Sequence, residues 1–428
     1  MAGEGEEIRT LERTPTWAVA IVCLILIIIS TLIEHAIHFL TKFFRKRRKS
    51  LYQALHKIQS ELMLYGFLSL LLTITKEPIT KICIPRSAAE NFLPCEFEEH
   101  SSAIEEETFC HKQGKVSLLS GKGLNQLQIL IFVLAFYHVV SCVLTFALGM
   151  AKMRRWEAWE EETRTLDYQF SHDPRRFRLT KQTTFAQRHI KFWSEHRLLR
   201  WPVCFFRQFI GSVSKTDYTT LRHGFIMAHL AEGSEFNFQN YLKRALDTDL
   251  QVVVGVSVWI WMVSVFFIFF KAYEFYSYLW LPFVPLVMLL AVGTKLQVII
   301  TKMCLESRGK ASVVVGTLVV KPHDNLFWFS RPQLLLYLMH FILFQNSFQL
   351  AFFTWTWYKF GLRSCFHRKT EDIVIRIAVG LIVQYLSGYV TLPLYALVTQ
   401  MGSSMKKAVF TEQVIVGLNR WHNTAKEN

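Results

Sequence analysis

The stretch LQILIFVLAFYHVVSCVLTFALGM, residues 127–150, is mostly apolar, and no acid, lysine or arginine interrupts it. A helix needs about 20 such residues to cross the roughly 30 Å of hydrocarbon in a bilayer. Directly after the stretch come Lys152, Arg154 and Arg155, which favour the water and headgroups at one side of a membrane. The stretch therefore predicts a transmembrane helix that ends near residue 150.

Six further apolar stretches are similar in length and composition. The seven, in chain order, are 17–40, 58–74, 127–150, 252–270, 275–300, 334–357 and 373–398. The second is short and contains Glu61, so its assignment depends on its flanks. Pro282, Pro285 and Pro393 predict local departures from regular helix, because proline removes an N–H donor. Residues 1–400 are thus predicted to form an all-α membrane protein, a seven-transmembrane helix bundle.

Basic residues in short loops predict the orientation, since they concentrate on the cytoplasmic side. A cluster without any acid follows the first stretch: Lys42, Arg45, Lys46, Arg47, Arg48 and Lys49. This cluster predicts that the N-terminus lies outside and the C-terminus lies in the cytoplasm. Counting onward places 77–125 outside, and it places 151–250 and 401–428 inside.

The cysteines agree with that orientation. Four fall in segments predicted to lie outside, where disulfides persist: Cys83, Cys95, Cys110 and Cys365. An even number on this side predicts two disulfides, with three pairings open. The others lie in predicted spans or on the reducing side, and we expect them to be buried thiols. They are Cys23, Cys142, Cys204 and Cys304.

The cytoplasmic segment 151–250 is too long for a structureless connection. Because it mixes aromatic and basic residues, it predicts amphipathic helices that lie on the inner leaflet or cap the bundle. Residues 166–170 and 176–180, around Pro174, predict a short strand pair. The net charge of +15 would suit a nucleic-acid binder, but seven apolar stretches exclude that class, so no nucleic acid is expected.

Ionisable groups inside the spans suggest a functional path, because they are costly in lipid. Glu34 and His38 lie four residues apart in the first span, and Glu61 lies in the second. These three are candidates for a cation path. Further polar residues lie in the other spans: His138, Lys295, His340, Gln345, Asn346 and Gln384. The alternative is that such groups serve hydrogen bonding between helices or extend to the membrane surface.

Catalytic motifs are missing from the sequence. It contains no H-E-x-x-H, G-x-S-x-G or C-x-x-C pattern. His35 and His38 have a spacing that suits a metal, but two histidines without further ligands make a weak site. We therefore expect no enzyme, no metal site and no cofactor.

The last segment, 401–428, predicts a partner helix. One face of this helix is formed by Phe410, Val414, Leu418 and Trp421, and its flanks carry Lys406, Lys407 and Arg420. A basic amphipathic helix with an aromatic anchor is typical of calmodulin targets. The same pattern is typical of a helix that lies on the inner leaflet, so both interpretations stay open at this point.

Long stretches of the sequence resemble one family. They are TPTWAVA at 14–20, ELMLYGFLSLLLT at 61–73, CFFRQF at 204–209, DYTTLRHGF at 217–225, VGTKL at 292–296 and TLPLYALVTQMGS at 391–403. Through them the chain resembles the plant Mlo family, the powdery-mildew susceptibility proteins, over essentially its whole length.

The resemblance implies a seven-span plasma-membrane protein with an outer N-terminus and four structural outer cysteines. It also implies a helix that binds calcium-loaded calmodulin, with anchors that match Leu418 and Trp421. The implied function is a calcium-permeable channel that modulates pathogen defence and cell death. The expected partners are calmodulin and the lipid bilayer, and assembly with further copies of the chain stays open.

Two other classes share the predicted topology, a non-conducting membrane scaffold and a receptor coupled to G proteins. The third span ends in Met153-Arg-Arg-Trp instead of the acid-Arg-aromatic triplet expected of such a receptor. The short gap between residues 270 and 275 also contains no cysteine that could join the third span. These features disfavour the receptor, whereas the sequence does not separate a channel from a scaffold.

Overall fold

The structure is a computed structural model. It describes residues 49–85, 110, 115–171, 177–179, 183–230, 236–254, 282–310, 313–315, 320, 323–361 and 370–402, with single positions at 21–39, 259 and 262. The contacts divide the chain into two units, Met1–His56 and Lys57–Asn428. In the first unit the described positions between 21 and 39 are helical and exposed.

Helices form almost all of the described structure. The longer ones are α2 (Lys49–Ile74), α6 (Gly121–Glu162), α11 (Lys215–His229), α12 (Phe238–Val254), α14 (Phe283–Lys310), α15 (Pro332–Phe360) and α16 (Thr370–Tyr385). The shorter ones are α3 (Lys76–Thr80), α7 (Leu166–Ser171), α8 (Thr184–His189), α9 (Phe192–Glu195), α10 (Arg197–Arg207) and α17 (Leu392–Thr399). Single 3-10 turns lie at Asp324–Leu326 and Trp328–Ser330.

Four helices are long and apolar enough to cross a bilayer among the residues that the structure describes. They are Gly121–Glu162, Phe283–Ser307, Pro332–Phe360 and Glu371–Thr399, and Leu62–Ile74 is a shorter apolar helix. These match five of the seven predicted spans. The span predicted at 17–40 is described only at single positions, and most of the span predicted at 252–270 lies outside the described residues.

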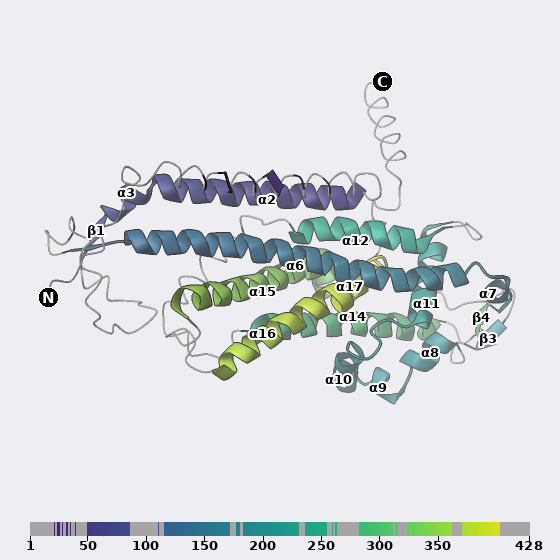
Figure 1. Ribbon diagram of the computed structural model, residues 1–428. Coiled ribbons are helices and arrows are strands. Elements are labelled where there is room, and N and C mark those ends of the chain that lie inside the picture. The colour runs from purple at the N-terminus through teal and green to yellow at the C-terminus, as the bar shows by residue number, and fades with distance from the viewer. Residues whose placement is uncertain are drawn as a thin grey trace, which may run out of the picture. The chain divides into compact units, whose positions relative to one another are not determined.

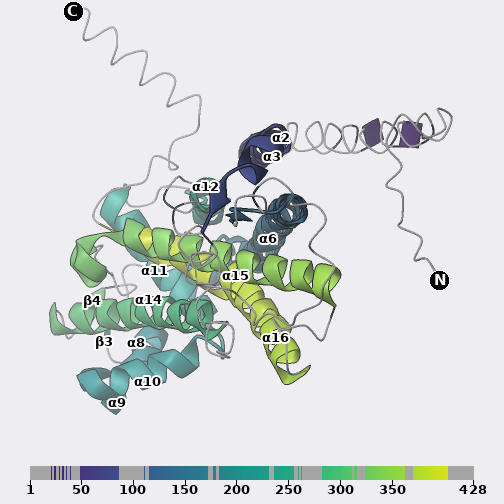
Figure 2. The same ribbon diagram turned by 90° about the vertical axis from the view of Figure 1, so that its left-hand side faces the viewer.

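The spanning helices pack around α15, which contacts α6, α12, α14 and α16 (Figure 1). In Figure 2, where α6 is seen nearly end-on, α15 crosses the view between α6 and α14, with α16 beside it. Helix α6 has 42 residues, about 63 Å at 1.5 Å per residue. Because hydrocarbon is only about 30 Å thick, α6 continues well past the predicted end of its span into the segment predicted to be cytoplasmic.

Proline shapes two of these helices as expected. Helix α14 begins at Phe283 and has Pro285 in its first turn, where a missing N–H is tolerated. Before Pro393, residues Leu386–Thr391 widen into the π-helical segment η6, which joins α16 to α17. Such π segments inside helices are frequent at functional sites.

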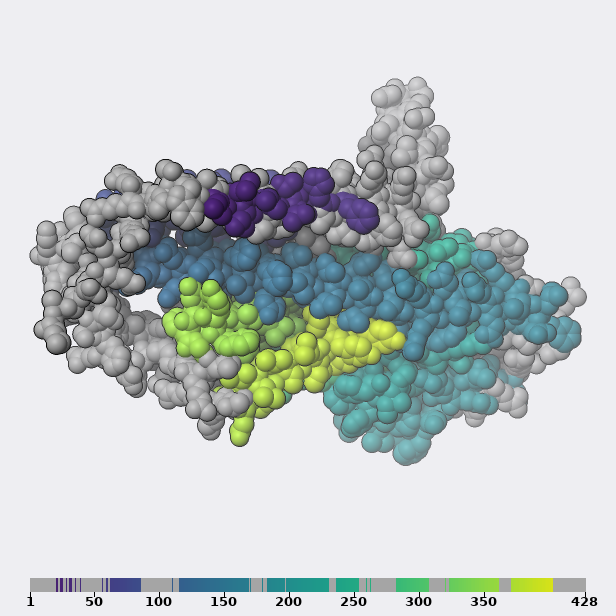
Figure 3. Space-filling view, viewed as in Figure 1, coloured from purple at the N-terminus to yellow at the C-terminus, as the bar shows by residue number. Residues whose placement is uncertain are grey.

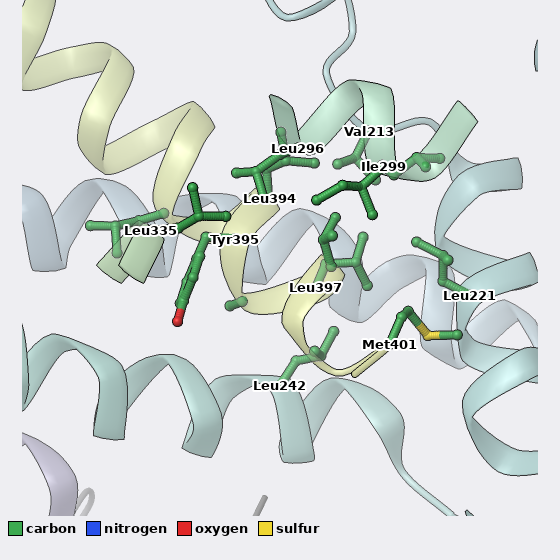
Figure 4. Close-up of a cluster of buried hydrophobic side chains, with 14 of the residues drawn as sticks. Val213, Leu221, Leu242, Leu296, Ile299, Leu335, Leu394, Tyr395, Leu397 and Met401 are labelled. Carbon is green, nitrogen blue, oxygen red and sulfur yellow. The ribbon is translucent and has the colours of Figure 1, made fainter. Parts of the chain in front are cut away.

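The core beneath η6 is apolar and tightly filled. Residues Leu392–Thr399 of α17 are all buried. Leu394 and Leu397 point toward side chains of α14 and α12, and Tyr395 lies near Leu335 (Figure 4). Met401 extends the same cluster at its end. This core joins the spans to the helices of the segment 151–250.

The predicted strand pair within 166–180 is wrong. Leu166–Ser171 is helix α7, and the Thr165 hydroxyl accepts a hydrogen bond from the Tyr168 N–H at 3.4 Å. Strand β3 (Phe177–Leu179) pairs antiparallel with β4 (Val313–Val315) instead. The prediction failed because a local cap favours a helix at 166–171, while three β-branched valines far along the chain supply the partner strand.

At the end of the bundle where α6 begins, a short ribbon joins β1 (Cys83–Ile84) to β2 (Val116–Ser117). A disulfide connects Cys83 to Cys110 beside it. This confirms that two of the four predicted outer cysteines pair with each other. Cys95 and Cys365 lie outside the described residues.

Candidate functional site

A neutral polar network joins α6 to α16 inside the bundle. The Gln384 amide donates to the Ser141 carbonyl at 2.9 Å and to the Thr145 hydroxyl at 2.8 Å. The Ser141 hydroxyl in turn donates to the Gln384 side-chain oxygen at 2.8 Å. All three residues are buried. Hydrogen bonding between helices therefore accounts for Gln384, one of the polar residues singled out from the sequence.

A second polar contact joins α15 to α16. The Asn346 amide donates to the Gly380 carbonyl at 3.1 Å. A side chain at Gly380 would meet Leu350 at 2.8 Å, so glycine permits the close approach of these helices. Asn346, too, is explained by helix packing.

A small cavity lies beside the Gln384 network. Its lining includes the polar side chains of His138, Ser141, Thr145 and Ser347, together with leucine and valine. Its volume is close to the minimum that one water molecule requires. Among the described residues, buried side-chain nitrogens of His340 and Gln345 have no hydrogen-bond partner, which is unusual for polar atoms at this depth.

Lys295 lies apart from this polar group. It is buried in α14, and its ammonium lies 5.9 Å from the centre of the Trp328 ring, close to the start of α15. A cation over an aromatic face is attracted by the ring quadrupole. Lysine and tryptophan are both typical of the zone where a span meets the headgroups.

Charged groups are buried only a few turns further along α6. Glu160 is 2% exposed and accepts hydrogen bonds from the Tyr218 hydroxyl at 2.8 Å and the Phe238 backbone at 3.2 Å. The Arg222 guanidinium donates to both of its carboxylate oxygens, at 3.1 and 3.0 Å. Burial, and next the negative charge of Glu160, raise the pKa of Tyr218. Glu160 thus ties α6 to α11 and α12.

A second buried carboxylate lies at the start of α11. Asp217 forms a capping box with Ser214, in which each side chain accepts from the other's backbone N–H. The His189 ring lies 2.8 Å from one Asp217 oxygen, and the Arg188 guanidinium lies 3.4 Å from the other. On its other side, His189 Nδ1 lies 3.1 Å from Arg207.

The contacts of His189 fix its protonation. A guanidinium can only donate, so Nδ1 accepts from Arg207, and Nε2 bears the hydrogen that is donated to Asp217. Burial lowers the pKa of His189, which keeps the ring neutral. Burial alone would raise the pKa of Asp217, but the bonds from His189 and Ser214 and the charge of Arg188 hold that pKa below its usual value.

The Thr301 hydroxyl lies 3.3 Å from His189 Nδ1. A hydroxyl, an imidazole and a carboxylate therefore lie in a row here, which is the order found in catalytic triads. This row does not form a nucleophile. The Thr301 hydroxyl donates to the Gln297 carbonyl at 3.1 Å, and neither Thr301 nor His189 has exposed surface. The arrangement stabilises the contact of α8 with α14 and α11, and a substrate cannot reach it in this structure.

Most of the residues predicted to have a function lie outside the described part of the chain. Glu34 and His38 do so, and the side chain of Glu61 is likewise not described. The calmodulin-target residues also fall outside it: Lys406, Lys407, Phe410, Val414, Leu418, Arg420 and Trp421. Among the described residues, no group of three or more His, Cys, Asp or Glu side chains is arranged to hold a metal ion.

The inner cysteines are as predicted where the structure describes them. Cys142, Cys204 and Cys304 are buried thiols that do not form disulfides. The buried carboxylates Glu160 and Asp217 were missed from the sequence. One signal in the sequence could have pointed to Asp217. Ser214 precedes it by three residues, and this spacing suits a capping box at the start of a helix.

Comparison with known proteins gives a consistent result. The model of the Mlo family matches residues 8–108 and 98–428. The chain is 50% identical to "MLO-like protein 6" of Arabidopsis thaliana, over 100% of this chain and 79% of that protein. It is 47% identical to "MLO protein homolog 1" of Oryza sativa subsp. japonica, with 100% and 82% covered. It is also 47% identical to "Protein MLO" of Hordeum vulgare, with 99% and 80% covered. No solved structure matches the chain.

Proposed function

The chain belongs to the Mlo family and is a multi-pass membrane protein, and from this premise we propose that it is a calcium-permeable channel of the plant plasma membrane. In this proposal, calcium-loaded calmodulin binds its cytoplasmic end and adjusts its activity in pathogen defence and cell death. The observation that supports the proposal best is the family match along the whole chain. The protein is proposed to have no enzymatic activity.

The proposed topology has seven spans, an outer N-terminus and a cytoplasmic C-terminus. The basic cluster between residues 42 and 49 supports this orientation. The bond between Cys83 and Cys110 fits it as well, because disulfides persist on the oxidising face. The buried charges around Glu160 and Asp217 then belong to the cytoplasmic side.

The cation path is proposed to involve Glu34, His38 and Glu61. Their cost in lipid supports a role beyond packing. Gln384 and Asn346 do not compete for this role, since both are engaged between helices. Current recording with the purified protein in a planar bilayer separates a channel from a non-conducting scaffold.

Calmodulin is proposed to bind residues 404–422, with Leu418 and Trp421 as anchors in its apolar groove. Calcium opens that groove, so binding requires calcium and couples to local influx. A buried tryptophan often contributes about 2–4 kcal/mol to an interface. Trp421→Arg and Leu418→Arg are each expected to weaken binding at least about tenfold.

This binding is tested by titrating calmodulin onto the intact protein in nanodiscs, with and without calcium. Lys406→Gln and Lys407→Gln serve as matched variants that should change mainly the association rate and its salt dependence. Equal affinity without calcium, or no loss for Trp421→Arg, would instead favour a helix that lies on the inner leaflet.

A further inference from the structure

Helix α10 (Arg197–Arg207) turns its apolar side away from the rest of the protein. Leu198 is 88% exposed and Phe206 is 65% exposed, and Trp201 is exposed on the same face. Arg200 and Arg207 point the other way. Arg200 donates to the Ser194 carbonyl at 2.9 Å, and Arg207 donates to His189. A helix in water shows the opposite distribution.

The segment that contains α10 dips along α14 and returns. The Cys204 thiol lies 3.8 Å from the Thr301 hydroxyl. The Gln208 amide donates to the Thr294 hydroxyl, which lies two turns closer to the start of α14 than Thr301. Beyond Gln208 the chain reverses at Gly211, where φ is 67°, a conformation that favours glycine. Ser212 is then back at the level of Gln297, whose amide donates to its carbonyl.

The tip of this reversal is apolar and exposed. Phe209 is 48% exposed and Ile210 is 81% exposed. The two carbonyls that follow them are nevertheless satisfied by side chains, because the Gly211 carbonyl accepts from Arg188 at 3.0 Å and the Ser212 carbonyl accepts from Gln297. Internal satisfaction of carbonyls is what a segment at membrane depth requires.

The contacts with α14 fix the depth of the tip. Gln208 fills the space that a side chain at Gly293 would need. Gly293 lies seven residues before residue 300, where the span is predicted to end, and this corresponds to about 10 Å of helix.

We propose that residues 197–212 form a re-entrant segment whose exposed face and tip contact the acyl chains of membrane lipid. In Figure 3 the teal surface of this part of the chain lies at the lower margin of the view, with no other coloured segment below it. An acyl-chain environment explains why seven large apolar side chains are exposed within 20 residues while Arg200 and Arg207 are engaged inside. The residues are Phe192, Leu198, Leu199, Trp201, Phe206, Phe209 and Ile210. The cytoplasmic leaflet is implied by the proposed orientation.

The proposal is tested with the full chain in phosphatidylcholine nanodiscs, with benzoylphenylalanine placed at Ile210. Two further positions serve as the negative and the positive control. Leu166 on α7 is 82% exposed and lies beyond the end of α6, whereas Phe132 is 72% exposed within the span of α6. After irradiation, mass spectrometry is expected to find lipid adducts at 210 in similar yield to 132 and severalfold above 166.

Yield at 210 no higher than at 166 would overturn the proposal, and so would crosslinks to another protein in place of lipid. High salt or added phosphatidylserine should leave the yield unchanged, because acyl chains carry no charge. A yield that falls in high salt would indicate headgroup attraction and contradict acyl contact.

The yield of lipid adducts depends only on how deep residue 210 lies in the membrane, so an inverted topology would leave the yield unchanged. Vesicles whose two leaflets differ in lipid mass would reveal that inversion separately.

Discussion

Helix α6 passes through two cores that bury polar groups differently. Around Ser141 and Thr145, its partners on α16 are neutral amide and hydroxyl groups. Around Glu160 the partner is the guanidinium of Arg222, and both are shielded from water. Neutral hydrogen bonds are cheap to keep in hydrocarbon, whereas an ion pair needs several donors to offset its desolvation. The change along one helix therefore indicates where the bundle leaves the membrane.

Removing the charge from the second core should have the largest effect. Glu160→Ala leaves Arg222, whose side chain is only 19% exposed, without its carboxylate. We expect it to lower the free energy of unfolding by about 3–5 kcal/mol. The matched variant is Glu162→Ala, two residues on, whose pair with Lys215 is about half exposed. That variant should cost less than about 1 kcal/mol. Unfolding by SDS titration in detergent micelles measures both, and equal losses would remove the distinction between the two carboxylates.

A disulfide lies at the end of the bundle where α6 begins, and this gives the next largest effect. Because Cys83 pairs with Cys110, elimination predicts that Cys95 pairs with Cys365. Each bond is expected to contribute about 2–4 kcal/mol. Mass mapping without reduction should find both bonds and should find Cys142 as a thiol. Free thiols at Cys95 and Cys365 would contradict the predicted pairing.

The charged core should also respond to pH. The folded state lowers the pKa of His189 from 6.5, so below about pH 6.5 the unfolded chain binds a proton that the folded chain does not. Stability is therefore full above that pH and falls on acidification, by at most about 1.4 kcal/mol per pH unit. In His189→Gln this part of the slope between pH 7 and 5 should be absent.

The control for the pH experiment is His196→Gln, at an exposed position. It should keep the slope of the original protein. SDS titrations at several pH values measure all three proteins. An unchanged slope in His189→Gln would show that the buried imidazole is not the source.

The neutral core should show the smallest effect. Gln384→Leu removes three hydrogen bonds of neutral groups. Such bonds in membrane proteins contribute about 0.6 kcal/mol on average and rarely exceed about 2 kcal/mol. The matched variant is Tyr385→Phe, at an exposed position on the same helix, which should change little. A loss for Gln384→Leu as large as that for Glu160→Ala would contradict the contrast between the cores.

The sequence predicts the membrane helices well, because apolar length is a local property of the chain. The stretches at 127–150, 334–357 and 373–398 correspond to α6, α15 and the α16–α17 pair. It does not predict that α6 continues through residue 162. The thickness of the membrane determines how long the apolar stretch must be, but it does not determine where the helix ends. The pairing of β3 with β4 depends on contacts between distant segments.

The two cores were predictable to different degrees. Gln384 was conspicuous, since an amide within an apolar stretch is rare, but its partners Ser141 and Thr145 are ordinary residues in such helices. Glu160 was hidden among Glu157, Glu161 and Glu162, which look alike in the sequence. Only the packing of α11 and α12 distinguishes it, through the contacts of Tyr218 and Phe238.

We propose that the neutral core packs the helices, while the carboxylates of Glu34 and Glu61 line the path of calcium. Calcium influx into proteoliposomes tests it with Glu34→Gln, Glu61→Gln and Gln384→Leu, each corrected for the amount of folded protein. We predict influx above that of protein-free liposomes, a severalfold loss in both glutamate variants, and no loss in Gln384→Leu. Influx no higher than in protein-free liposomes, or unchanged influx in both glutamate variants, would contradict the account.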